Sequence, residues 1–338
     1  MTPAVRPRPV RSSGRLLHVD IAAGSVDDRT PRDLPALLEP GDLLVFNDAA
    51  TLPASLAGSA HGEPLELRLL AAEPDASWRA VAFGAGDHRS PTERRAPPPR
   101  LGAGDRLELG ALSAIVEQVL PQSPRLLRVR FDAAGAEFWE RLYRAGRPVQ
   151  YSYVARPLEL WDVQTAYASV PWAAEAPSAG HHFDVALLLA LRRRGVDVAT
   201  VTHAAGLSST GDPALDAALP LEERLAIPAR TAHAVPYAKR AGHRVIAVGT
   251  SVVRALEGRA LEHGGRIPAG QGSTTLRIGP GYRRRVVDGL FTGMHEPTES
   301  HHALLASFAP RALLERALAR AEAAGYLGHE FGDACLLL

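Results

Sequence analysis

The chain of 338 residues is poor in cysteine and carries almost no net charge. Its one cysteine, Cys335, excludes a disulfide framework and a zinc site built on several thiolates, and it fits a reducing cytoplasm. Because the formal net charge is +1, no global basic field attracts nucleic acid, and such a partner would need a local basic patch. The apolar fraction of 46% and the charged fraction of 22% are ordinary for a globular protein, which we expect to be cytoplasmic.

Long apolar segments are also missing. No run approaches the roughly 20 apolar residues that a membrane-spanning helix needs, so we expect no association with a membrane. The first residues, 1–9, are rich in proline and arginine and lack the apolar core of a signal peptide. Residues 1–12 are therefore expected to be extended or disordered.

Two kinds of pattern alternate along the chain and predict two domains. Residues 1–56 and 150–338 combine fully apolar strands, such as Leu43–Phe46, with helices, which is typical of an α/β domain. Residues 57–149 hold short segments of alternating character between Gly, Pro and Asp turns, and these predict a small antiparallel barrel. The expected fold is a mixed-sheet α/β main domain with an inserted small antiparallel β-barrel domain.

The segment 175–184 places His181 and His182 directly ahead of an apolar helix. Its last residue is an aspartate of the kind that caps helices, and free N–H groups at a helix start attract anions. A strand over 196–202 follows and leads to His203. Ligands of α/β proteins lie where strands end and helices begin, so these histidines are candidate site residues. A tight structural connection is the alternative.

Other strand ends also carry polar residues. Asn47 and Asp48 follow the first apolar strand, where local capping is the more common use of such a pair. Gly249 and Thr250 stand between a strand and a helix over 252–263, which is a weak signal for a phosphate or carboxylate cradle.

Several charged or polar segments have plain explanations. Arg254 and Glu257 are three residues apart on an expected helix, so they can pair with each other. Arg283–Arg285 form a basic cluster, which indicates a solvated surface or a contact with a phosphate backbone. Residues 206–219 are polar and predict a loop. The His, Glu and Asp residues lack the spacing of known metal motifs, so we expect no metal.

The order of these motifs resembles the queuosine-pathway S-adenosylmethionine:tRNA ribosyltransferase-isomerase family, from Arg11 onward. The pieces that carry the resemblance are Leu43–Asp48 with Pro53 and Ala54, Gln164 and Thr165 with Tyr167 and Ala168, Ala176–Gly180 with His182 and Phe183, His203, Val245–Thr250 with Arg254, Leu256 and Glu257, Pro280–Tyr282, Val287 and Asp288, Thr292, His295, Pro297, and Gly332–Ala334.

The resemblance implies an α/β main domain with an inserted barrel, as the pattern of residues 57–149 also indicates. It implies that S-adenosylmethionine is a co-substrate that donates its ribosyl group. The acceptor is the aminomethyl group of a 7-deazaguanine at the wobble position of tRNA. Adenine and methionine leave, epoxyqueuosine remains on the tRNA, and no metal takes part. The resemblance leaves the oligomeric state open.

Roles for site residues follow from the same resemblance. The sulfonium acidifies the ribose C5′–H, which a base must remove, and adenine needs a proton as it leaves. Histidine suits both tasks near neutral pH. His182 and His203 are the acid and base candidates, in either order, and His295 is a third catalytic candidate that orients the site. The expected substrate-binding residues are Asn47, Asp48, Ser178, Gly180, Phe183, Glu223, Gly249, Thr250, Arg254 and Asp333.

The chain also departs from the family pattern. Ala49 and Ala50 stand where the family has a Thr-Arg pair, and Pro220 and Leu221 stand where Met-His is expected, with Glu223 retained. Two other interpretations therefore stay open. One is a paralogue that uses S-adenosylmethionine with an acceptor other than tRNA, which the near-neutral net charge favours weakly. The other is a non-catalytic protein that binds a nucleoside or RNA on the same scaffold.

Overall fold

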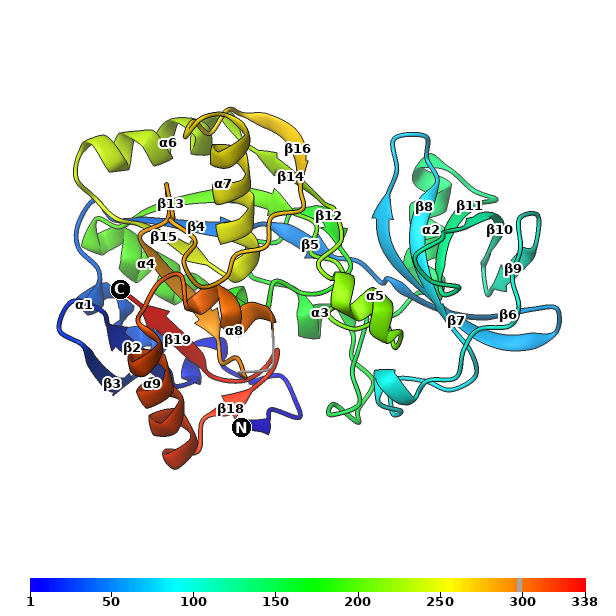
Figure 1. The fold of residues 1–338 in the computed structure, drawn as a ribbon, viewed down its shortest axis with the longest axis horizontal. Coiled ribbons are helices and arrows are strands. Elements are labelled where there is room, and N and C mark those ends of the chain that lie inside the picture. Colours follow the sequence, from blue (N-terminus) through cyan, green and yellow to red (C-terminus); the bar gives the residue numbers. More distant parts are fainter. Residues whose placement is uncertain (297–299) are drawn as a thin grey trace.

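The structure, a computed structural model, describes residues 1–296 and 300–338. It has two parts lying side by side, an α/β part that contains both ends of the chain and a β-barrel (Figure 1). The expected α/β fold with an inserted antiparallel barrel is confirmed. Pro297, one of the residues that carry the family resemblance, lies outside the described residues.

A nine-stranded mixed sheet forms the centre of the α/β part. In spatial order its strands are β16 (Gly270–Thr274), β14 (Glu223–Ile227), β13 (Asp197–His203), β4 (Leu43–Asn47), β15 (Val245–Val248), β17 (Gly289–Gly293), β19 (Ala334–Leu337), β2 (Leu16–Asp20) and β3 (Ser25–Arg29). The four strands β13, β4, β15 and β17 are parallel, so their C-terminal ends meet on one side, which we call the strand-end side. The antiparallel strands β14 and β19 begin on that same side.

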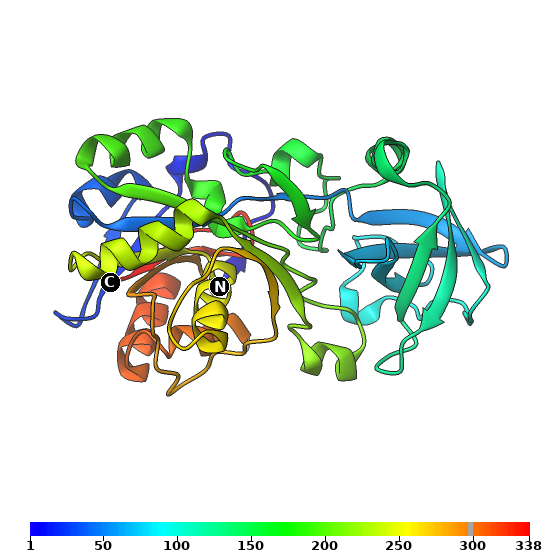
Figure 2. The same ribbon diagram turned by 90° about the horizontal axis from the view of Figure 1, so that it is seen from above.

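Helices cover both faces of the sheet, because alternate side chains of each strand point to opposite faces. In β4, Leu43 and Val45 join the core under α7 (Thr250–Glu262), whereas Leu44 and Phe46 join the core under α4 (Val185–Arg194). Figure 2 shows α4 on one side of the sheet and α7 and α9 on the other. The helices are α1 (Leu34–Leu37), α4 (Val185–Arg194), α6 (Ala229–Arg240), α7 (Thr250–Glu262), α8 (Ser300–Leu305) and α9 (Arg311–Ala323).

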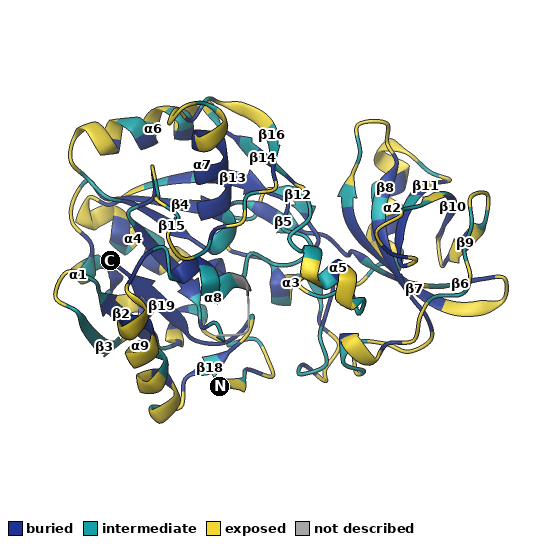
Figure 3. Cartoon of the chain, viewed as in Figure 1, coloured by how far each residue is buried: buried dark blue, intermediate teal, exposed yellow. Residues whose placement is uncertain are grey.

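The barrel closes from six antiparallel strands in the order β10-β11-β8-β7-β6-β9. They are β6 (Ser55–Ala60), β7 (Glu63–Ala72), β8 (Trp78–Phe83), β9 (Arg106–Leu109), β10 (Leu112–Val119) and β11 (Leu126–Phe131), followed by α2 (Gly135–Ala145). Gly58 permits closure, because a Cβ there would lie 2.0 Å from the Glu108 carbonyl oxygen on β9. The leucine-rich interior is buried while the outer loops are exposed (Figure 3).

Short elements connect the two parts. The strand β5 (Ala49–Thr51) continues from β4 and pairs with β12 (Val170–Ala173), and α3 (Leu160–Val163) lies nearby (Figure 1). Within the described ranges, no helix has the length and apolar character needed to cross a bilayer.

Two segments that were expected to lack regular structure can be compared with the structure. Residues 1–12 are largely extended, because β1 (Thr2–Pro3) pairs with β18 (Leu327–Gly328). The loop expected over 206–219 is wrong in part, because it contains α5 (Pro213–Ala218). Asp212 caps that helix by accepting hydrogen bonds from the backbone N–H groups of the next turn, a signal that the Gly- and Ser-rich flanks obscured.

Candidate active site

Polar residues gather on the strand-end side of the sheet. Asn47 ends β4, His203 ends β13, and Gly249 follows β15. Glu223 joins them because β14 runs antiparallel to β13 and begins here. The parallel topology therefore brings together residues that are about 200 positions apart in the sequence.

Asn47 connects two strand ends. Its side-chain oxygen accepts a hydrogen bond from the His203 backbone N–H at 2.9 Å, and its amide nitrogen donates to the His203 carbonyl at 2.9 Å. It also accepts from the Ala49 N–H at 3.1 Å and approaches the Ser251 hydroxyl at 3.4 Å. Asp48 accepts a hydrogen bond from the Thr202 hydroxyl at 2.7 Å. The Asn47 side chain thus fixes the local backbone, Asp48 contacts a side chain of β13, and Ser251 is a neighbour that the sequence did not reveal.

His203, Glu223 and Arg254 form a buried charged cluster. His203 is fully buried, and its Nε2 lies 3.2 Å from the Glu223 carboxylate, which also pairs with the Arg254 guanidinium. Burial opposes ionisation of Glu223, but His203 and Arg254 outweigh it and lower the pKa of Glu223 to about 2. Neither ring nitrogen of His203 has a hydrogen-bond partner within the described residues, although Nε2 is in ionic contact. A buried nitrogen without such a partner can accept one from a ligand.

The pairing expected between Arg254 and Glu257 is wrong. Arg254 points to Glu223 instead, and its Nε donates to the Leu276 carbonyl at 3.2 Å. Glu257 is fully buried and accepts hydrogen bonds from the backbone N–H groups of residues 285–287. Arg254 and Glu257 are both buried charges, and each is paired with groups that are distant in the sequence. Pairing of a buried charge outweighs the small energy of a surface ion pair within one helix.

The start of α7 lies next to this cluster. Gly249 has a φ of 96°, a conformation that favours glycine, and it turns the chain from β15 directly into the 13-residue helix. Thr250 is the first residue of the helix, so its N–H is among those without a partner inside the helix. Such groups at a helix start can bind an anion, and a cradle for one here stays a prediction.

The short 3-10 helix η4 (Ser178–His182) carries the other histidine candidate. His182 is buried, its ring lies 5.7 Å from that of Phe291, and its Nδ1 has no hydrogen-bond partner in the described structure. Burial, followed by the positive charges of His181 and Arg8, lowers the pKa of His182 to about 3. The imidazole is therefore neutral at pH 7.

Other predicted residues around η4 serve packing. Phe183 is fully buried between Phe46 and Phe291, with ring centroids 4.8 and 4.9 Å away, so it belongs to the core. A Cβ on Gly180 would lie 2.0 Å from the Tyr167 hydroxyl, so a residue with a side chain would clash at this position. Ser178 is half-buried at the start of η4.

His295 and Asp333 come from the C-terminal part of the chain. The Nε2 of His295 lies 2.7 Å from the Thr292 hydroxyl at the end of β17, and its ring stacks on His301. Asp333 accepts hydrogen bonds from the backbone N–H groups of Arg15 and Leu327, both at 2.8 Å, and from Arg8 at 2.6 Å. Asp333 therefore anchors the N-terminal segment beside the site.

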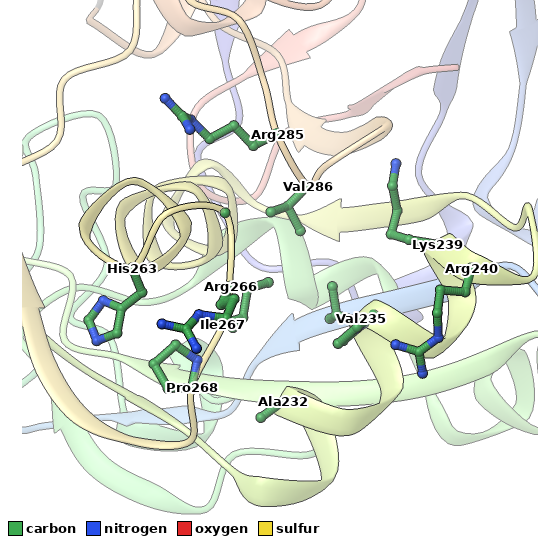
Figure 4. Close-up of a pocket in the computed structure, with 12 residues that line it drawn as sticks. Ala232, Val235, Lys239, Arg240, His263, Arg266, Ile267, Pro268, Arg285 and Val286 are labelled. Atoms are coloured by element: carbon green, nitrogen blue, oxygen red, sulfur yellow. The ribbon is translucent and has the colours of Figure 1, made fainter.

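A cavity of about 190 Å³ opens beside η4, between residues 7–11, α3 and the loop before β19, and His182 lines it. A larger cavity of about 640 Å³ lies between α6 and the end of α7 (Figure 4). Its rim carries Arg240, Arg266 and Arg285, and it includes none of the predicted site residues.

Among the described residues, no group of three or more His, Cys, Asp or Glu side chains could hold a metal ion.

Comparison with known proteins identifies the family. The model of the queuosine biosynthesis protein family matches residues 2–337. The chain belongs to this family. An S-adenosylmethionine:tRNA ribosyltransferase-isomerase of Gluconacetobacter diazotrophicus is 38% identical over 343 residues, covering 99% of this chain and 92% of the relative. One from Thermus thermophilus is 37% identical over 316 residues, covering 91% and 87%.

A solved structure supports the fold of this queuosine biosynthesis family member. The crystal structure of an S-adenosylmethionine tRNA ribosyltransferase from Thermotoga maritima matches with a TM-score of 0.53, covering 99% of this chain and 96% of that one. The sequence identity is 24%, so this likeness bears on the fold alone.

The departures from the family pattern lie outside both cavities. Ala49 is buried in β5, where it pairs with Val170, and Ala50 is its neighbour in that strand. Leu221 packs against the core of the barrel. None of these three positions lines either cavity.

Proposed function

We propose that this member of the queuosine biosynthesis family is an S-adenosylmethionine:tRNA ribosyltransferase-isomerase. It transfers the ribosyl moiety of S-adenosylmethionine to a 7-aminomethyl-7-deazaguanine in tRNA, releases adenine and methionine, and forms epoxyqueuosine. Relatives with this name align over 98–99% of the chain at 36–38% identity, which supports a shared reaction. The observation that supports the location of the site is the buried cluster of His203, Glu223 and Arg254 beside the start of α7.

The chemistry of S-adenosylmethionine fits this cluster. Its methionine carboxylate can bind at the N–H groups of Thr250 and Ser251, the first two residues of α7, where the helix dipole favours an anion. A ligand bound there would contact Arg254 and Glu223, which already neutralise each other. These two buried groups would therefore lose little further hydration when the ligand binds.

The two buried histidines differ in a way that supports an assignment of roles. Burial lowers the pKa of His182, so the ring is neutral, and its Nδ1 has no hydrogen-bond partner within the described residues. We assign it as the base that removes the ribose C5′ proton. The Nε2 of His203 lies 3.2 Å from the ionised Glu223 carboxylate. We assign it as the acid that protonates the departing adenine.

The other predicted residues support these roles indirectly. Asn47 fixes the backbone of His203, and Asp333 holds Arg8 near His182. His295 stands at the end of β17, where its contact with Thr292 orients the ring. We assign Asn47 and Asp333 as positioning residues, and His295 as a contact to the substrate.

Adenine release tests the function directly. The protein is incubated with S-adenosylmethionine alone, with unmodified tRNA, and with tRNA that carries 7-aminomethyl-7-deazaguanine at the wobble position. We expect adenine only in the third reaction, together with epoxyqueuosine in the tRNA. Adenine released with a different acceptor would support a paralogue, and tight binding without any adenine would support a non-catalytic protein. Either result contradicts the proposal.

A further inference from the structure

Trp161 is the most exposed of the large apolar side chains in the described part of the chain, at 71%. Two other tryptophans are covered, since Trp78 packs 5.5 Å from Phe138 and Trp172 lies under Arg224. Exposure of Trp161 does not reflect disorder, because its short helix α3 is closed by a reciprocal cap between Glu159 and Asp162. An indole fixed in an exposed position offers a flat surface for stacking.

The helix α3 is fastened to the strand-end side of the sheet. Gln164, directly after α3, exchanges hydrogen bonds of 2.9 and 2.7 Å with the backbone of Thr51 in β5. Arg11 donates to the backbone carbonyl oxygens of Trp161 and Gln164. Trp161 is therefore held at a fixed place between the N-terminal segment and the strand that follows Asn47.

Beside Trp161 lies the cavity of about 190 Å³ that His182 also lines. Sites for drug-sized ligands measure about 300–1,000 Å³. The cavity is thus too small for the whole of S-adenosylmethionine, but it suits one planar ring system. His181 and Phe331 also line this cavity, and their rings are stacked, with planes within 8° of parallel and centroids 5.7 Å apart.

The polar groups of the cavity suit the edge of a purine. Glu330 contributes a carboxyl group, which the Tyr153 hydroxyl contacts. Burial raises the pKa of Glu330 to about 7, so the carboxyl is not committed to one protonation state at neutral pH. Arg11 bonds only to carbonyl oxygens within the described residues, so no carboxylate neutralises it by direct contact. Its charge remains available to a phosphate.

We propose that this cavity receives the 7-deazaguanine base of the tRNA, turned out of its strand, with Trp161 stacking on the base and Glu330 accepting from its N1–H and 2-amino groups. Recognition of splayed-out RNA bases by aromatic stacking and by hydrogen bonds to the Watson–Crick edge is the common mode for single-stranded RNA. Arg11 faces the phosphate backbone of the same nucleotide. The inference rests on the proposed function, because it assigns the acceptor subsite of that reaction.

The position of the cavity suits an acceptor next to the S-adenosylmethionine site. The helix η4 lies between them, since His182 lines the cavity while a Cβ on Gly249 would lie 3.6 Å from Ala179 in η4. A base bound beside Trp161 and a ribosyl donor bound at the start of α7 would both contact η4.

Substitution of Trp161 tests the stacking. In adenine-release assays with tRNA that carries the modified base, W161A should raise the KM for tRNA about tenfold or more and leave the KM for S-adenosylmethionine within about twofold. W161F should restore most of the affinity for tRNA. The matched control is Y237A, since Tyr237 on α6 is 58% exposed and lies far from the cavity in the fold, and it should change neither KM.

Substitution of Glu330 tests the recognition of the base edge. Anticodon stem-loops with guanine or hypoxanthine at the wobble position serve as competitive inhibitors, and hypoxanthine lacks the 2-amino group. The wild type should bind the guanine form more tightly, and E330Q should lose most of that preference. W161A and E330Q should both keep the Tm and circular dichroism spectrum of the wild type within a few degrees, which excludes unfolding as the cause.

Each other outcome overturns the inference. If W161A raises the KM for S-adenosylmethionine alone, the cavity holds the adenine of the donor instead. If neither KM changes, Trp161 takes no part in binding. A wild-type protein that releases no adenine with the modified tRNA refutes the proposed function itself, whereas a fully active wild type with an unaffected W161A refutes only the acceptor subsite.

Discussion

Asn47 and His203 hold each other through a pair of 2.9 Å hydrogen bonds between the Asn47 side chain and the His203 backbone. The two residues end neighbouring parallel strands, β4 and β13. This reciprocal contact fixes the backbone from which the His203 ring projects toward Glu223, so it joins the architecture of the sheet to the chemistry of the site.

Asn47→Ala should destabilise the protein by about 2–4 kcal/mol, because it removes the side-chain oxygen that accepts from the buried backbone N–H groups of His203 and Ala49. Urea unfolding measures this loss. Asn47→Asp keeps the acceptor oxygen and removes the donor, so it should lie between the wild type and Asn47→Ala. An Asn47→Ala protein as stable as the wild type, with unchanged kcat, would show that the contact has no structural role.

His182→Ala should lower kcat by about 10²–10⁴-fold, the usual contribution of a general base. The fold should persist, because the Nδ1 of His182 has no hydrogen-bond partner in the described structure to lose. Single-turnover adenine release and the Tm provide the two readouts. The control is His233→Ala, an exposed histidine on α6 that should leave both unchanged. Wild-type kcat in His182→Ala would eliminate His182 as the base.

Glu223→Gln should cost about 3–5 kcal/mol of unfolding free energy at pH 7, because Arg254 and His203 lose a buried ionised partner. Glu262→Gln on the same α7 helix removes only a half-exposed pair with Arg259 and should cost less than about 1 kcal/mol. Equal effects of the two substitutions would contradict the importance assigned to the buried cluster.

The same carboxyl predicts a pH dependence with a definite sign. The pKa of Glu223 falls from 4.5 to about 2 in the folded protein, so the unfolded chain binds more protons in that interval. Its contribution is complete above about pH 4.5 and is lost as the pH falls through that value toward about 2. Urea unfolding of the wild type and Glu223→Gln at pH 5, 4 and 3 should show a difference that shrinks with each step. A difference that stays constant would refute this coupling.

Gly180→Ala should lower the Tm, since its Cβ would lie 2.0 Å from the Tyr167 hydroxyl in a buried position. Tyr167→Phe removes that oxygen, so the double variant should recover part of the loss. Full stability of Gly180→Ala alone would mean that the Tyr167 ring moves aside without cost. Thermal unfolding of the three variants decides between these results.

The sequence predicts the local features of this fold well and its long-range partners poorly. Asp184 caps α4 and Gly195 ends it in a left-handed conformation, because both effects depend on neighbouring residues. The barrel follows from the alternating pattern of its strands. By contrast, the sequence suggests Glu257 as the partner of Arg254, and the tertiary fold supplies Glu223, 31 residues away. Phe183 likewise follows a motif but packs in the core.

The candidate site shows the same division. The histidines and the start of α7 are visible as strand-end motifs, because parallel strands place their ends together. No sequence motif marks Trp161 or Glu330 as a site residue. The two residues line the same cavity although they are about 170 residues apart in the sequence. Only the three-dimensional arrangement brings an exposed indole, a buried carboxyl and His182 around one space.

The order of strands determines when the nine-stranded sheet can be completed during synthesis. The hairpin of β2 and β3 attaches to the other strands only through β19, and β19 is made last. The first strands to leave the ribosome must therefore wait for more than 300 residues before they join the sheet. Arg8 pairs with Asp333, so this wall of the cavity forms only after residue 333 has been synthesised, and a shorter nascent chain has no complete site in which to bind RNA.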